Sequence, residues 1–115
     1  MTHHVPFAGT ATFVPSGHSG VLNHMMLGRA EGAIDDVSVW HGTFEPGGSA
    51  TMHVHDDERQ IYIALSGALV TGTASVEVEL GPLDAFAIPA GERHFIENRS
   101  QEVATLLVIS TPALR

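Results

Sequence analysis

Short runs of strand-forming residues, broken at close intervals by glycine and proline, constrain the fold of this chain more than any other feature. The clearest run, Ser75–Leu80 (SVEVEL), alternates apolar and polar residues as a strand with one buried face does. Turn-forming sequences, such as EPGG at Glu45–Gly48 and PAGE at Pro89–Glu92, separate the runs. Many short strands at regular spacing predict an all-β sandwich or barrel. We expect strands at residues 21–27, 36–44, 50–55, 60–65, 67–72, 74–80, 84–89, 93–98 and 103–110.

The chain has 115 residues, the length of one ordinary domain, and its 43% hydrophobic content is that of a globular protein. Only residues 28–36 (GRAEGAIDD) have any helical character, and their two glycines make a loop an equal alternative. The first twenty residues contain few core-forming side chains. We therefore predict an N-terminal arm at 1–20, which contacts a second copy, and a single barrel domain at 21–115.

The charge of the chain excludes several classes of partner. A net charge of −8, with five scattered arginines as the only cations, argues against nucleic acid and anionic membranes, because a phosphate-binding face needs clustered cations. The absence of cysteine excludes disulfides and thiolate chemistry, and the absence of lysine excludes a side-chain Schiff base. Without a signal-peptide pattern or a membrane-length apolar run, a cytoplasmic location is expected.

Eight histidines are many for so short a chain. Two segments of the chain contain four polar residues that could together bind a metal ion. His53 and His55 lie two apart in a strand-like run, so their imidazoles should project from one face, as metal ligands do. Gln60 begins the next run and, on an antiparallel return strand, can face the same space. His94 follows the tight turn at Pro89–Gly91 and could supply a fourth donor. A His-x-His pair alone also occurs by chance.

The first of these segments resembles the first motif of the cupin superfamily, which has the form G-x5-H-x-H-x3–4-E-x6-G. Gly47, His53, His55 and Gly67 match it, and Gln60 stands at the position of the glutamate.

The second segment resembles the second cupin motif, G-x5-P-x-G-x2-H-x3-N. Pro89, Gly91, His94 and Asn98 match it, and Leu83 replaces the first glycine. The glycines and the proline would shape turns, and Asn98 would satisfy backbone groups near its turn.

The resemblance implies a jelly-roll barrel of two facing antiparallel sheets that holds one divalent metal ion per chain. By position, the metal ligands would be His53, His55, Gln60 and His94. Zinc, iron, manganese and nickel all suit such a site. Three alternatives remain for the glutamine: a ligand through its amide oxygen, a sign of a site that has lost its metal, or a bystander whose place is taken by Glu58.

Other polar residues are weaker candidates for the site. His41 and His24 could face the barrel interior as proton-transferring groups, and Tyr62 could do the same; each could equally be a packing or outer-face residue. His3, His4 and His18 lie in the polar arm and are expected to be solvated.

The resemblance implies an enzyme that acts on a small organic metabolite, aromatic or polyketide-like and anionic. A glutamine ligand leaves the charge of the ion uncompensated and removes a carboxylate base, which favours Lewis-acid chemistry such as isomerisation, cyclisation or a lyase reaction. The alternatives are a dioxygenase of the quercetinase-like type and a non-catalytic binding or accessory cupin. Because cupins commonly pair, a homodimer is expected.

Overall fold

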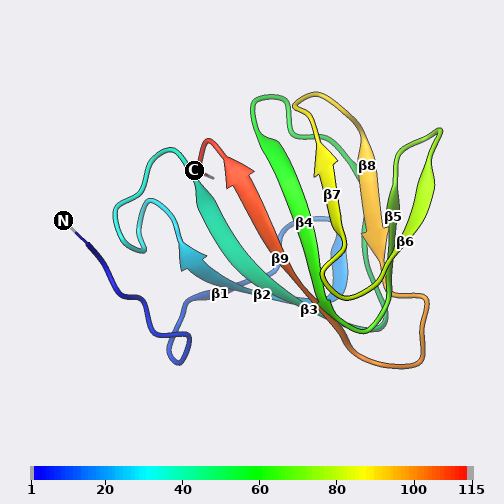
Figure 1. Ribbon diagram of the computed structural model, residues 1–115, viewed down its shortest axis with the longest axis horizontal. Helices are drawn as coiled ribbons and strands as arrows, with labels where there is room; N and C mark the ends of the chain where they lie inside the picture. Colours follow the sequence, from blue (N-terminus) through cyan, green and yellow to red (C-terminus); the bar gives the residue numbers. More distant parts are fainter. Residues whose placement is uncertain (1, 114–115) are drawn as a thin grey trace.

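The computed structural model describes residues 2–113, and these contain nine strands and no helix (Figure 1). Residues 28–36 form a loop, which is one of the two alternatives that their sequence allows; they do not form a short helix. No described segment forms a helix that is long and apolar enough to span a membrane. The strands are β1 (Thr12–Phe13), β2 (His18–Leu27), β3 (Ser38–His53), β4 (Arg59–Ser66), β5 (Leu69–Gly72), β6 (Glu77–Leu80), β7 (Ala85–Ile88), β8 (His94–Glu97) and β9 (Ala104–Thr111).

All strand pairs are antiparallel, and the strands form one hydrogen-bonded sheet in the order β6-β5-β8-β3-β9-β4-β7, with β2 and β1 added at β3. The sheet curls into a nearly closed barrel (Figure 1). One layer contains β2, β9, β4 and β7, the other contains β8, β5 and β6, and the long strand β3 runs through both. The predicted all-β jelly-roll barrel is therefore confirmed.

Strand β3 differs from the prediction, because the turn expected at Glu45–Gly48 is a bend inside one continuous strand. Residues up to Phe44 pair with β9, and residues from Ser49 pair with β8. Gly47 has a φ of 81° at the point where the partner changes. The EPGG sequence therefore redirects the chain from one layer to the other without ending the strand.

The core lies between the two layers and consists of the inward-facing side chains of the strands. Trp40 and Phe44 of β3, Tyr62 of β4, and Leu106 and Val108 of β9 are buried there. Burial of such large apolar side chains, at about 1.5–3 kcal/mol each, is what holds the two layers together.

The N-terminal segment is part of the sheet over some of its length. Thr12 of β1 pairs with His24 of β2, and His18 pairs with Ala50 in the second half of β3. The boundary expected after Gly20 falls inside β2, where a bulge separates two stretches of pairing. Residues 2–11 form no strand.

Candidate metal centre

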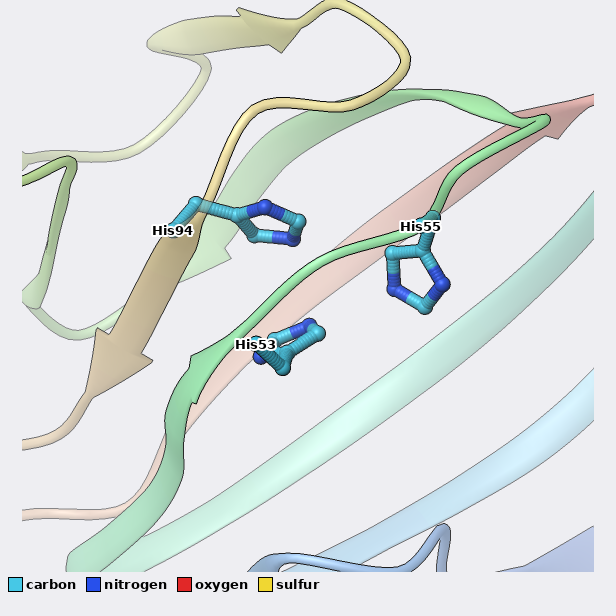
Figure 2. A group of neighbouring side chains, drawn as sticks. All are labelled: His53, His55 and His94. Carbon is cyan, nitrogen blue, oxygen red and sulfur yellow. The ribbon is translucent and has the colours of Figure 1, made fainter.

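Three histidines from two elements meet at one end of the barrel (Figure 2). His53 ends β3 and is the cross-strand partner of His94, which begins β8, while His55 follows β3 by two residues. The ring centroids are 4.2 Å apart for His53 and His94, 5.0 Å for His53 and His55, and 5.5 Å for His55 and His94. One nitrogen from each ring lies within 4.8 Å of the other two. Three imidazoles at this separation can share one ion.

Hydrogen bonds fix the tautomer of two of these rings. The Nδ1 of His53 donates to the carbonyl of Thr51 at 2.7 Å, and the Nδ1 of His94 donates to the carbonyl of Glu92 at 2.9 Å, because a carbonyl can only accept. Each ring therefore keeps a lone pair on Nε2. The Nε2 of His94 is shielded from solvent and has no hydrogen-bond partner in the described chain. A metal-binding histidine uses the same arrangement, in which the second ring nitrogen is held by a carbonyl.

The surroundings of His94 and His55 favour the uncharged form of these two imidazoles. The pKa of His94 is lowered to about 4, mainly by burial and in smaller part by the neighbouring His53 and His55, while the hydrogen bond to the carbonyl of Glu92 acts in the opposite direction. Burial and His53 also lower the pKa of His55, although Glu58 and Asp56 act in the opposite direction. Neutral imidazole is the form that coordinates metal ions.

The turn at Pro89–Gly91 is tied directly to the His-x-His segment. The amide of Gly91, whose φ is 81°, donates to the carbonyl of His55 at 2.9 Å. Asn98 fixes the other end of β8, because its Nδ2 donates to the carbonyls of Phe44 at 3.1 Å and Glu102 at 2.6 Å. The structural roles predicted for Gly91 and Asn98 are thus confirmed, and they hold the two motif segments in contact.

Gln60 is buried on β4, between Ile88 of β7 and Ser110 of β9, and lines the same cavity as His53 and His55. Strand β4 is not the direct return partner of β3, since β9 lies between them, but the curl of the sheet brings Gln60 to this space. Its side chain forms no hydrogen bond within the described residues, which leaves the amide oxygen available. The carboxylate of Glu58 does not belong to the group of mutually close ligand atoms.

The cavity beside the histidines has a volume of about 100 Å³. Its wall is mainly apolar, and none of the described residues that line it carries an Asp, Glu, Lys or Arg side chain. Such a space accepts a small molecule whose charge, if any, must be balanced by a bound ion. The lining side chains are Pro15, His18, Asn23, Trp40, Phe44, His53, His55, Gln60, Tyr62, Ile96, Leu106 and Val108.

Of the weaker candidates, only Tyr62 reaches the cavity. It is buried beside His94, and burial raises the pKa of its hydroxyl, which therefore stays protonated. His24 and His41 form a cross-strand pair on the outer face, because β3 turns the alternate residues Trp40 and Gly42 inward. Of the two alternatives left open for His24 and His41, the structure therefore has the outer-face position.

The expectation that His18 is solvated is wrong. His18 is half-buried, lines the cavity, and has its ring centroid 5.9 Å from that of His53. No local pattern in the sequence marks this residue, since its place depends on pairing with Ala50 in a distant part of the chain.

The family model for the cupin domain matches residues 40–110, which is more than half of the chain. The chain therefore belongs to the cupin family, as the two motifs indicated. No curated protein matches the sequence.

Solved structures share the fold at low identity. KdgF from Halomonas sp. has a TM-score of 0.82 at 17% identity, covering 97% of this chain and 96% of that one. The polyketide cyclase RemF from Streptomyces resistomycificus has a TM-score of 0.82 at 21% identity, covering 96% and 80%. A predicted oxalate decarboxylase from Thermotoga maritima has a TM-score of 0.79 at 22% identity, covering 97% and 100%. These likenesses establish the fold alone.

Proposed function

We propose that this protein is a mononuclear metal-dependent enzyme that acts on a small anionic organic molecule, aromatic or polyketide-like, by Lewis-acid chemistry such as isomerisation, cyclisation or a lyase reaction. The observation that carries the proposal is the convergence of His53, His55 and His94 beside a cavity, with Nε2 free on two of the three rings. Structures of similar fold include a polyketide cyclase, a predicted oxalate decarboxylase and a sugar phosphate isomerase, which supports small-molecule chemistry in a barrel of this kind.

The residues present fit one divalent ion. Three neutral imidazoles would supply nitrogen donors, and the buried, unpaired amide of Gln60 would supply an oxygen. Zinc, iron, manganese and nickel accept this mixture of donors. An ion held there supplies a Lewis acid that polarises an oxygen atom of the substrate.

The other cavity residues would bind and orient the substrate. The flat side chains of Trp40 and Phe44 form an apolar wall that favours an aromatic or conjugated molecule and excludes water. The protonated hydroxyl of Tyr62 can donate a hydrogen bond to an oxygen of the substrate. Among the described residues that line the cavity none carries a carboxylate, so the wall itself would not repel an anionic substrate. A neutral ligand set would leave a bound ion a stronger Lewis acid.

The test is the metal content of protein purified without added metal. We expect one equivalent of a divalent metal per chain by elemental analysis, and loss of that metal in the double variant His53→Ala/His55→Ala with the β-type circular dichroism spectrum retained. The matched control is His24→Ala/His41→Ala, which removes a histidine pair from the outer face and should keep the metal. Full metal content in the His53/His55 variant would contradict the proposed site.

We also propose that the protein is a homodimer that pairs through the outer face of β4 and β9. Both strands are apolar on both faces, which is unusual for a strand with one side in water. The outward residues Ile61, Ile63, Leu107 and Ile109 are half-buried and adjoin one another across the two strands. Arg59 lies at one end of this face, and neither strand carries a carboxylate. Since each copy carries a net charge of −8, a face without carboxylates is where a second copy can approach without strong repulsion.

A further inference from the structure

His18 is a fourth imidazole at the edge of the candidate metal centre, and the donor set described above does not use it. Its ring lines the cavity and lies 5.9 Å, centroid to centroid, from that of His53. Its Nδ1 is shielded from solvent and has no hydrogen-bond partner among residues 2–113. A buried polar atom without a hydrogen-bond partner is energetically unfavourable, so binding of a ligand that forms a hydrogen bond with this ring is favoured.

The backbone around His18 is held against the strand that carries His53. His18 pairs with Ala50 of β3, and both the amide and the hydroxyl of Thr51 donate to the carbonyl of Gly17 at 3.4 Å. Gly17 has a φ of 80°, a conformation that favours glycine, so the chain turns sharply just before the histidine. The backbone that carries His18 is therefore held beside the cavity by hydrogen bonds.

His18 stands outside the set of close metal donors. The group of nitrogens that lie within 4.8 Å of one another belongs to His53, His55 and His94 and does not include His18. The other two histidines of residues 2–20, His3 and His4, are exposed and cannot replace it. The separation of 5.9 Å between the rings of His18 and His53 therefore suits contact with a molecule bound in the cavity better than coordination of the ion.

The cavity determines the class of ligand that His18 would meet. None of the described residues that line the cavity has a charged side chain, and the proposed metal ligands are neutral. A divalent ion at this site would therefore keep its full charge and favour the binding of an anion. A cavity volume of about 100 Å³ suits a small anionic molecule. A carboxylate has a second oxygen that needs a hydrogen-bond donor once the first is engaged.

We propose that the imidazole of His18 donates a hydrogen bond to an oxygen of a small carboxylate bound in this cavity and so selects carboxylates over single-atom anions. This inference rests on the proposed function. His18 is on this account a ligand-contacting residue that contributes nothing to metal content.

The test is ligand titration of protein loaded with Co²⁺, followed by visible absorption, with acetate and chloride as probes. In His18→Ala we expect an unchanged cobalt stoichiometry, an acetate affinity about ten-fold lower, as for loss of one hydrogen bond to a charged group, and little change in chloride affinity. His18→Gln, which keeps an N–H donor, should recover part of the acetate affinity. The control is His4→Ala, at an exposed position of the same segment, which should match the wild type.

Loss of cobalt from both His18 variants, with melting temperatures unchanged, would make His18 a metal ligand and overturn the inference. Unchanged acetate affinity, or equal losses for acetate and chloride, would overturn it as well while leaving the metal centre intact. A wild-type protein that takes up no cobalt would instead overturn the proposed function and, with it, this role of His18.

Discussion

At Gln60 a neutral amide occupies a buried position on β4 that faces the same cavity as His53 and His55. A carboxylate there would add a charged oxygen donor for a divalent ion, but without the ion it would be a buried charge with no cation on the cavity wall. The amide avoids that cost and would leave a bound ion electron-poor. The residue at this position is therefore expected to set the charge of the site.

Gln60→Glu should bind divalent metal roughly ten-fold more tightly, because ligand charge strengthens binding, and should bind azide more weakly by a similar factor. The metal-free variant should melt at a lower temperature than metal-free wild type. Gln60→Ala is the control and should lose only a little metal affinity, since three imidazoles remain. Competition with a chelator, azide titration and thermal melting measure these effects. Equal azide affinity in wild type and Gln60→Glu would mean that the amide does not control the charge.

His94 makes the free energy of unfolding of the metal-free protein depend on pH. Its pKa is about 4 in the folded chain, against an ordinary value near 6.5 when unfolded. Between these values the unfolded chain binds a proton that the folded chain excludes, so the free energy of unfolding falls as pH decreases from about 6.5 to about 4. Urea unfolding at several pH values measures this slope. His94→Gln should have a shallower slope, and an identical slope in the two proteins would rule out His94 as its source.

At the scale of elements, the connection from β6 to β7 contains a leucine, Leu83, in a backbone conformation that favours glycine. Leu83 has a φ of 68°, which side chains with a Cβ rarely adopt, and it stands where the cupin motif has glycine. The turn is held by hydrogen bonds from the Leu83 amide to the carbonyl of Ala64 at 2.7 Å and from the Asp84 amide to that of Gly81 at 3.0 Å. The side chain is 78% exposed and packs little in return.

Leu83→Gly should stabilise the protein by about 0.5–1 kcal/mol, which is the cost of the left-handed backbone less the added entropy of glycine in the unfolded chain. The melting temperature should rise by roughly 2–5 °C. Leu83→Ala keeps the same strain and loses only an exposed side chain, so it serves as the control and should change little. A glycine variant that melts below the alanine variant would show that the side chain contributes more than the backbone conformation costs.

At the scale of the whole molecule, the outer face of the sheet carries a cluster of apolar side chains on β4 and β9. Outward apolar residues at Ile61, Ile63, Leu107 and Ile109 lie in adjoining rows of that face. An apolar face of this kind favours interaction with another protein surface, and the proposed symmetric pairing of two copies would cover it.

Ile63→Glu should convert a dimer into a monomer, because it places a charge in the proposed interface of an already acidic protein. Sedimentation at micromolar concentration measures this change. Val76→Glu is the control, since it also replaces an apolar side chain by a carboxylate but lies at an exposed position in the connection between β5 and β6. A wild-type protein that sediments as a monomer would contradict the proposal, as would an Ile63→Glu protein that remains dimeric.

The sequence by itself determined the fold class and the metal ligands expected at the site. Alternation in runs such as SVEVEL and the turn residues between runs act locally, because the period of side chains along a strand is set by backbone geometry. The approximate positions of β4, β8 and β9 followed from these signals. The spacing of His53, His55 and His94 in two motifs was enough to predict that they meet, and the structure brings their rings together.

Only the tertiary structure decided which faces and which distant partners these residues have. His18 reaches the cavity because it pairs with Ala50, while His24 and His41 point away because the register of β2 on β3 puts them on the outer face. The EPGG segment continues a strand because β8 and β9 both supply pairing partners along β3. Register and side are fixed by hydrogen bonds and burial between segments far apart in the chain, and local sequence does not encode them.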